Sequence, residues 1–262
     1  MAESQRYDKE ELQYIYDTSI IHILRWLDKH FFTLCDFEKK SILDVGCWWG
    51  WFVKYAADRG ASAFGFDIEK ERIDDARRFA ETGSFCVCGA QDISFASGCF
   101  DLVFAWDILE HVTRPDRMIS EIGRVLKQEG TLILAVPNDY NLATLPYRWC
   151  RFLLNRRDVF LKEGRRYDFI RSLAYTDNDH KREYTTGAIR AVLEAGDFKI
   201  EHMKFYGLDL PVPLRGIFTR RQQAFIRDKC GAFTLPWLRS HIVVKASKKT
   251  RSWPDKPALT IR

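Results

Sequence analysis

The sequence predicts an α/β protein with a doubly wound, mostly parallel sheet, an antiparallel closing strand and a helical lid insertion. Three observations lead to this class. Short apolar runs alternate with amphipathic helical patterns between Ser41 and Asn138. The first apolar run ends in a glycine-containing turn that opens a helix. After residue 180, one more helical pattern is followed by two apolar runs. The 262 residues are enough for one elaborated domain.

The first half of the chain gives the clearest pattern. Segment 8–32 has apolar residues at three- and four-residue spacings, which predicts one amphipathic helix packed on the core. Strands and helices are then expected in alternation, as strands Ser41–Val45, Ala63–Phe66, Phe85–Cys88, Phe100–Ala105 and Thr131–Val136, and as helices Phe52–Ala57, Glu69–Ala80 and Met118–Leu126. Such alternation implies βαβ units and a parallel sheet covered on both faces.

The composition changes after Asn138. Residues 139–180 interleave aromatic side chains with arginines, and we interpret them as an inserted helical lid. Thr185 or Thr186 is expected to cap a helix that runs through Leu193. The strands Phe198–Phe205 and His241–Lys245 then close the sheet. We therefore expect one domain, divided into helix 8–32, core 41–138, lid 139–180 and C-terminal helix and closing strands 185–248, followed by a loose tail at 249–262.

Composition and cysteine spacing argue against several classes of protein and of cysteine site. No apolar run approaches the roughly 18 residues that a membrane span requires. The first residues have no apolar stretch behind a basic start, so a secretion signal is not expected and a cytoplasmic location is the default. The seven cysteines are an odd number, and Cys86 and Cys88 share one face of a strand. We expect reduced core thiols here rather than zinc ligands or disulfides.

The net charge of +5 is unevenly distributed. From Gly207 to Arg262 there are twelve Lys or Arg against three Asp. We favour a solvated surface as the explanation, and contact with an anionic lipid at a membrane surface, a nucleotide or a nucleic acid stays open as the alternative.

The segment Ile42–Gly50 carries the strongest functional signal. A strand that ends in glycines and opens a helix brings backbone N–H groups against a ligand, which suits a carboxylate or a phosphate. Asp67 ends the next predicted strand, 23 positions after Asp44. A carboxylate about 20 residues beyond such a turn can accept hydrogen bonds from both hydroxyls of a ribose. Together these features predict an adenosine-type cofactor.

Five motifs in order resemble the class I S-adenosylmethionine (SAM)-dependent methyltransferases, especially the branch with the quinone-biosynthesis O-methyltransferases. They are I-L-D-V-G-C-W-W-G at 42–50, F-G-F-D-I at 64–68, G-A-Q-D-I at 89–93, F-D-L-V-F-A-W-D-I-L-E-H-V at 100–112 and R-V-L-K-Q-E-G-T-L-I-L-A-V-P-N at 124–138. The resemblance is good over 41–138 and moderate over 179–205. It implies a Rossmann-like fold and SAM as cofactor.

The resemblance also implies the cofactor-binding residues. They are Asp44, Gly46, Cys47, Trp48 and Gly50 in the glycine turn, Asp67 and Ile68 after the second strand, Gln91 and Asp92 at the adenine, and Trp106 at the methionine part. Two positions depart from the family. Trp48 stands where glycine is usual, so either the loop sends the indole outward or the pocket is narrowed. Gly89 stands where the family often has an acid, and Gln91 and Asp92 are assigned the adenine amino group in its place.

A base is needed if the acceptor is a hydroxyl, and a neutral histidine suits that role. We select His180, which enters the late helix, and His111, which follows Glu110. Each has a structural alternative: His180 could anchor the lid and His111 could be a structural hydrogen-bonder. Asp107, Glu110 and His111 form a D-x-x-E-H cluster similar to one that binds a divalent metal in some quinone methyltransferases. Because the pattern is also widespread in the family without metal, we predict no metal site.

These features together predict a SAM-dependent methyltransferase that acts on a small-molecule or lipid-linked acceptor. An oxygen of the acceptor is the expected site of methylation. The basic lid favours an anionic acceptor. Two alternatives remain open: a catalytically impaired methyltransferase-like binding protein, motivated by Trp48, and a methyltransferase of tRNA or a phosphorylated acceptor. A dehydrogenase would need G-x-G-x-x-G, but the positions read Gly46, Trp48 and Trp51. A DNA adenine methyltransferase would have N-P-P-Y or D-P-P-Y where this chain has residues 106–109, so DNA is not expected as a substrate.

Overall fold

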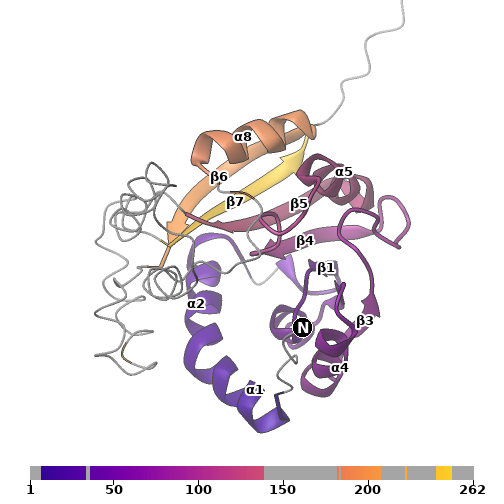
Figure 1. Cartoon of the computed structure of the whole chain (residues 1–262), viewed down its shortest axis with the longest axis vertical. Coiled ribbons are helices and arrows are strands. Elements are labelled where there is room, and N and C mark those ends of the chain that lie inside the picture. Colours follow the sequence, from indigo (N-terminus) through magenta and orange to yellow (C-terminus); the bar gives the residue numbers. More distant parts are fainter. Residues whose placement is uncertain are drawn as a thin grey trace, which may run out of the picture.

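A computed structural model of the chain describes residues 7–33, 36–138, 182, 184–207, 222 and 240–249. Its centre is a seven-stranded sheet (Figure 1), made of β1 (Ser41–Val45), β2 (Ser62–Asp67), β3 (Ser84–Val87), β4 (Phe100–Trp106), β5 (Leu126–Pro137), β6 (Phe198–Tyr206) and β7 (His241–Lys248). The strand order is β3-β2-β1-β4-β5-β7-β6. Strands β1 to β5 pair in parallel, and β7 is antiparallel to both β5 and β6. The predicted fold class, with its antiparallel closing strand, is confirmed.

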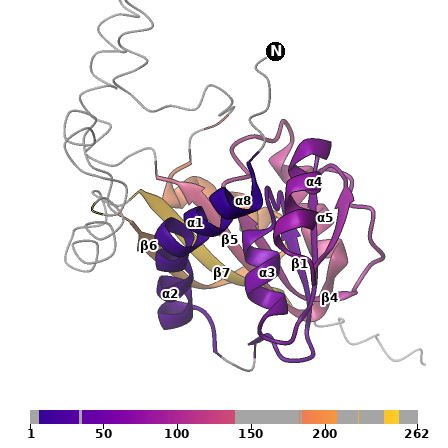
Figure 2. The ribbon, with the colours of Figure 1, turned by 90° about the horizontal axis from the view of Figure 1, so that it is seen from below.

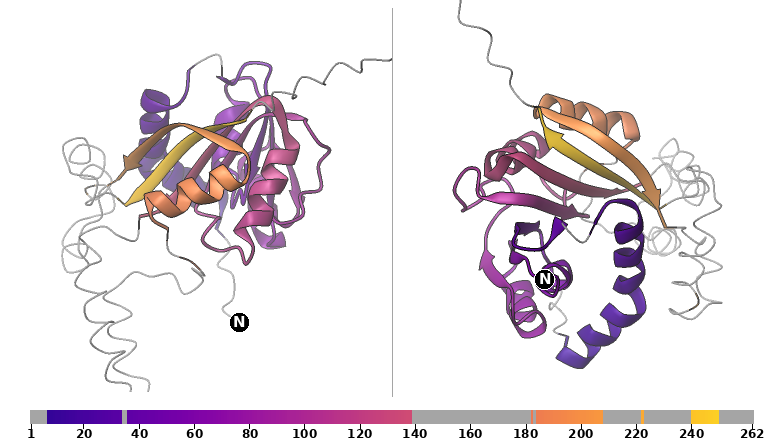
Figure 3. Two further views of the ribbon diagram at one scale, coloured as in Figure 1. Left: turned by 90° about the horizontal axis from the view of Figure 1, so that it is seen from above. Right: turned by 180° about the vertical axis from the view of Figure 1, so that it is seen from behind.

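Helices cover both faces of the sheet (Figures 2 and 3). One face carries α1 (Lys9–Ile15), η1 (Tyr16–Ile20), α2 (Ile21–His30), α3 (Trp51–Ala57) and α4 (Lys70–Phe79), and the other carries α5 (Pro115–Val125) and α8 (Thr186–Ala195). Alternation along the strands divides the apolar residues between the two layers. On β1, Ile42 packs in the α1–α4 layer and Leu43 in the α5–α8 layer. This two-sided burial explains why the parallel strands are almost continuously apolar.

Two elements differ clearly from those that the sequence pattern predicts, and one predicted helix cap is confirmed. The N-terminal helix is not continuous, because the π-helical turn η1 separates α1 from α2. Strand β5 begins at Leu126 rather than Thr131, since the backbone becomes extended directly after α5. Thr185 is confirmed as the cap of α8, where its Oγ1 accepts a hydrogen bond from Ala188 N at 3.1 Å. The predicted lid at 139–180 and the tail after Lys249 lie outside the described residues.

The antiparallel course of β7 has a direct effect on the site. Its first residue, His241, lies opposite Pro137, the last residue of β5. The carboxyl ends of β1, β2 and β4 meet at this same edge of the sheet, which is where open α/β sheets bind ligands. Residues from the end of the chain therefore join those of the glycine turn. Within the described ranges, no helix is both long and apolar enough to span a membrane.

Candidate functional site

The turn between β1 and α3 has an unusual backbone. Gly46, Trp48 and Gly50 have φ values of 72°, 50° and 79°, all in the left-handed region. A Cβ added to Gly46 would lie 2.9 Å from Ile108 Cδ1, so this glycine permits the β4 loop to approach the turn closely. Cys47 is buried and its N–H donates to Phe66 O at 2.8 Å, which ties the turn to β2. The turn is thus compact and fixed at the sheet edge, and we refer to residues 46–50 as the shelf.

The structure shows how far the side chain of Trp48 is buried, which the sequence leaves open. Its side chain is 38% exposed, and the Arg72 guanidinium lies 5.3 Å from the centre of its ring. The indole therefore lies at the surface beside α4 and is not buried beneath the turn. Its φ of 50° also explains why glycine is the easier residue at this position. Trp51, by contrast, is buried and packs edge-on against Phe104 and Trp106.

Asp67 lies at the end of β2, beside the shelf. Its carboxylate accepts hydrogen bonds from Trp48 N at 3.1 Å and from Glu69 N at 3.0 Å. These two donors orient the carboxylate, and each carboxylate oxygen keeps further acceptor capacity. The next residue, Ile68, has a side chain that is 75% exposed. An oriented acceptor next to an open apolar surface suits a ribose with its attached base.

Asp44 adds a second carboxylate beneath the turn. It is only 3% exposed, and burial, with a smaller contribution from the charge of Asp67, raises its pKa well above the usual range. Burial also raises the pKa of Asp67, while the N–H groups of Glu69 and Trp48 and the charge of Arg72 partly oppose this effect. Two carboxylates close to one another disfavour a phosphate and favour a ligand that brings hydrogen-bond donors or positive charge.

The residues assigned to the adenine are placed differently from one another. The side-chain oxygen of Gln91 accepts hydrogen bonds from Thr113 Oγ1 at 2.9 Å and Arg114 N at 2.8 Å. Gln91 therefore ties the loop after β3 to the start of α5. Asp92 is exposed and forms an antiparallel bridge with Gly89. Of these two side chains, the amide oxygen of Gln91 is engaged within the protein, whereas the carboxylate of Asp92 is exposed.

The end of β4 and the loop after it hold Trp106 and His111. Trp106 joins an aromatic cluster, with Tyr206 at 5.9 Å and His241 at 5.5 Å between ring centroids. His111 is half-buried, and its Nε2 lies 3.9 Å from Oε1 of the fully buried Glu110. Asp107 contacts His241 through its Oδ2. Among the described residues, no group of three or more His, Cys, Asp or Glu side chains is arranged to hold a metal ion.

His241 is the site residue that sequence reasoning missed. Its Nε2 lies 3.1 Å from Asp107 Oδ2, and its Nδ1 lies 2.8 Å from Ser240 Oγ. The contact joins residues 134 positions apart in the sequence, and no local pattern signals it. It could have been anticipated only by noting that an antiparallel closing strand begins at the ligand-binding edge.

His180, the first-choice base, lies outside the described residues. The chain just after it is tied to the β4 loop. Arg182 donates to Thr113 O at 3.1 Å, and the hydroxyl of Tyr184 donates to Leu109 O at 3.4 Å. The described cysteines, including Cys86 and Cys88, are free thiols.

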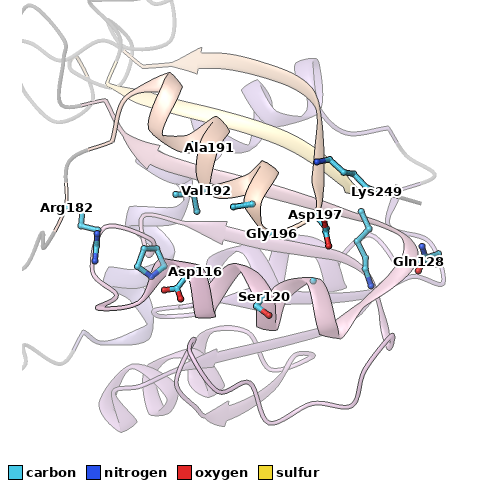
Figure 4. A pocket seen from close by; sticks show the side chains of 13 residues that line it. Asp116, Ser120, Gln128, Arg182, Ala191, Val192, Gly196, Asp197 and Lys249 are labelled. Carbon is cyan, nitrogen blue, oxygen red and sulfur yellow. The ribbon is translucent and has the colours of Figure 1, made fainter. Parts of the chain in front are cut away.

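A separate groove of about 1170 Å³ lies between α5 and α8 (Figure 4). Arg182 is at one end, and Lys249 is at the other; Lys248 also lines the groove. None of its lining residues belongs to the glycine turn or is one of the predicted cofactor residues. We therefore place the candidate site at the carboxyl edge of the sheet and not in this groove.

The shelf, the oriented Asp67 and the buried Asp44 fit SAM. Asp67 would hold the ribose, Ile68 and Asp92 would meet the base, and the turn above Asp44 would lie along the methionine part, which carries an ammonium group. Fold and site together define a Rossmann-like domain with a nucleoside-binding edge, and the motif order makes it a class I SAM-dependent methyltransferase domain.

Comparison with known proteins agrees with this class. Residues 43–134 match the family described as "Methyltransferase domain". A ubiquinone biosynthesis O-methyltransferase of Thiobacillus denitrificans is 30% identical over 142 residues, which cover 51% of this chain and 60% of that protein. The chain spans only 22% to 60% of the length of the first curated relatives that it matches.

Solved structures are similar over more of the chain. A SAM-dependent methyltransferase from Archaeoglobus fulgidus has a TM-score of 0.58 at 15% identity, covering 91% of this chain and 99% of that one. The magnesium protoporphyrin IX methyltransferase from Synechocystis, determined with bound S-adenosylhomocysteine (SAH), has a TM-score of 0.53 at 15% identity, covering 91% and 84%. Identities this low support the shared fold. The chain contains a class I SAM-dependent methyltransferase domain.

Proposed function

We propose that this protein transfers the methyl group of SAM to a hydroxyl oxygen of a small-molecule or lipid-linked acceptor. The observation that carries the proposal is the pair of carboxylates, Asp44 and Asp67, at the two strand ends beside the left-handed turn. SAM matches this site because it presents ribose hydroxyls to Asp67 and carries its positive charges in the methionine part.

The rival cofactor, a dinucleotide, fits the same site poorly. A pyrophosphate at the turn would lie close to the carboxyl groups of Asp67 and Asp44, whose raised pKa values already show that a further negative charge is disfavoured there. Trp48 and Trp51 also replace two glycines that a dinucleotide fingerprint requires.

When bound, SAM supplies a methyl group on a sulfonium centre that is already a good leaving group. The protein's contribution is then alignment, exclusion of water and, for a hydroxyl acceptor, removal of a proton. Gly46 permits Ile108 to close against the turn, so that the β4 loop and the turn form one continuous wall.

Oxygen as the methylated atom is supported by the function of relatives such as the Thiobacillus O-methyltransferase. An anionic acceptor is supported by the basic composition of residues 146–171, which have eight Lys or Arg against three acids. Contact with a membrane surface and a cytoplasmic location belong to the same proposal. DNA is not included among the substrates.

The alternative, a methyltransferase-like binding protein without activity, rests on Trp48. The partial exposure of its indole weakens that motive, because the side chain is not buried within the turn. Isothermal titration with SAM and SAH separates the two proposals at the first step. We expect micromolar affinity for both ligands, and absence of heat would favour the binding-protein alternative. Incubation of metabolite extracts with methyl-labelled SAM would then identify the acceptor.

A further inference from the structure

The end of β3 lies beside the proposed ribose site. Asp67, the last residue of β2, pairs with Val87, the last residue of β3, and its carbonyl oxygen accepts a hydrogen bond from Cys88 N at 3.0 Å. The glycine turn after β1 lies on the other side of β2 in the strand order. A nucleoside whose ribose is held by Asp67 and whose methionine part follows that turn therefore places its base over the loop after β3, residues 88–93.

Asp92 carries the one carboxylate of this loop, and its backbone is fixed within the loop. Its N–H donates to Gly89 O at 3.1 Å, and its carbonyl oxygen accepts a hydrogen bond from the Cys88 thiol at 3.3 Å. The Asp92 side chain is exposed, whereas the amide oxygen of Gln91 is already engaged by the start of α5. The loop therefore presents the Asp92 carboxylate as its acceptor for a group on the base.

Two charged side chains of α5 hold the end of this loop. Ile93 donates its backbone N–H to Glu121 Oε2 at 2.9 Å, and its carbonyl oxygen accepts from Arg124 Nη2 at 2.7 Å. Arg124 Nη1 also donates to Phe95 O at 2.7 Å. The side chain of Ile93 is buried in the core. Both backbone groups of the residue that directly follows Asp92 are thus fixed by one helix.

Glu121 and Arg124 also hold one another. Arg124 Nε donates to Glu121 Oε1 at 2.9 Å, and Nη2 donates to Oε2 at 2.8 Å, so the contact is made at both carboxylate oxygens. This hydrogen bonding raises the pKa of Arg124 and lowers the pKa of Glu121, so both groups are charged at neutral pH. The planar guanidinium can bridge a carboxylate and two carbonyl oxygens at once, whereas lysine carries its charge at a single point.

We propose that Glu121 and Arg124 are positioning residues that orient Asp92 and thereby give the site its preference for adenine over a base without an amino group. This inference rests on the proposed function. The pair acts through the backbone of Ile93 and does not itself bind the base. The exocyclic amino group of adenine donates to Asp92, whereas hypoxanthine presents a carbonyl oxygen at that position and leaves the carboxylate facing a second acceptor.

Isothermal titration with SAH and with S-inosylhomocysteine, its deaminated analogue, tests this proposal without a methyl acceptor. We expect the wild type to bind SAH about tenfold or more tightly than the analogue, because only SAH offers the amino group. Arg124→Met should lower this preference to less than about threefold, since Asp92 is then no longer held in place. The ribose is common to both ligands, so a change at Asp67 does not alter their ratio.

Two further variants link the pair to Asp92. Asp92→Ala should remove the preference directly, and the double variant Asp92→Ala/Arg124→Met should lose no more of it, because both changes remove the same contact. Arg124→Lys keeps the positive charge without the planar fork, and we expect it to lower the preference by about threefold or more. Thermal unfolding establishes that each variant is folded, and Arg124→Lys carries the test if Arg124→Met does not fold.

Arg190→Met is the matched control. It removes a helical ion pair with Glu194 on α8, where the two side chains are 3.7 Å apart and both are exposed. We expect this variant to keep the wild-type preference for SAH. A pair that only stabilised the fold would leave the ratio of the two affinities unchanged in the folded protein, so the ratio separates a positioning role from a structural one.

Each outcome has a defined meaning. Absence of binding of both SAM and SAH to the wild type would reject the proposed function itself. If SAH binds, the role of the pair is overturned while that function stands by any of three results: no preference in the wild type, a preference that survives Asp92→Ala, or a preference that persists in the folded Arg124 variants. Full preference in Arg124→Lys with loss in Arg124→Met would assign the effect to charge and would also overturn the positioning role.

Discussion

Replacement of Asp67 by alanine tests the proposed ribose site most directly. The carboxylate is held by two backbone donors, Trp48 N at 3.1 Å and Glu69 N at 3.0 Å, so it is oriented before any ligand arrives. Two ribose hydroxyls that donate to this carboxylate contribute about 1.5 kcal/mol each, at the lower end of the range for charged acceptors. Their loss sums to about 3 kcal/mol, which corresponds to an affinity roughly 150-fold weaker.

The ribose is common to SAM and SAH, so Asp67→Ala should weaken both ligands by the same factor in isothermal titration. Glu69→Gln is the matched control. Its exposed side chain bonds only Arg72 among the hydrogen bonds described, and its backbone N–H is retained, so its affinity should change by less than about threefold. Unchanged titration curves for Asp67→Ala, or a loss confined to SAM, would refute the ribose assignment.

Three further substitutions have defined outcomes. Asp44→Asn should raise Tm by about 2–4 °C at pH 8. Burial raises the pKa of the Asp44 carboxyl in the folded protein, so ionisation of this group lowers stability above the pKa of the unfolded state. The gain in Tm should be smaller at pH 5, because the wild-type carboxyl is then protonated. A gain equal at both pH values would contradict this reasoning. Gly46→Ala should cost about 1–2 kcal/mol in denaturant unfolding, because of its φ of 72° and the contact with Ile108 at 2.9 Å. Gly89→Ala, with nothing within 4 Å of its added Cβ, should cost less than about 1 kcal/mol, and equal losses would argue against strain at the turn. Trp48→Gly should stabilise the fold by about 1 kcal/mol through its φ of 50° and leave SAM affinity unchanged or tighter, whereas a large loss of affinity would make the indole a ligand contact.

The order of strands and helices was predictable because both faces of the sheet are buried. Parallel strands such as β1 and β4 are apolar on both sides, and α5 has a clear amphipathic pattern, so the local signals agree with the fold. The π-helical turn η1 was not predictable, since its residues keep the apolar spacing of a helix. The extra length of β5 was missed because residues 127–129 are polar and exposed.

The cofactor half of the candidate site could be predicted for a similar reason. Asp44, Gly46 and Asp67 stand at fixed distances along one βαβ unit, so sequence spacing alone places them at one edge. The contact between Asp107 and His241 has no such regular sequence spacing. His241 reaches Asp107 only because β7 enters the sheet between β5 and β6 in the opposite direction. A contact of this kind is set by topology and not by neighbouring residues.

The position of β7 also bears on the order in which the protein can assemble during synthesis. Strand β7 forms hydrogen bonds with β5 on one side and β6 on the other, yet it leaves the ribosome last of the three. A nascent chain that has not reached residue 240 therefore exposes the unpaired edges of β5 and β6, a state that invites intermolecular pairing. It also lacks His241. The growing chain can form the turn after β1 well before its sheet is closed, so the contact between Asp107 and His241 is among the last to form.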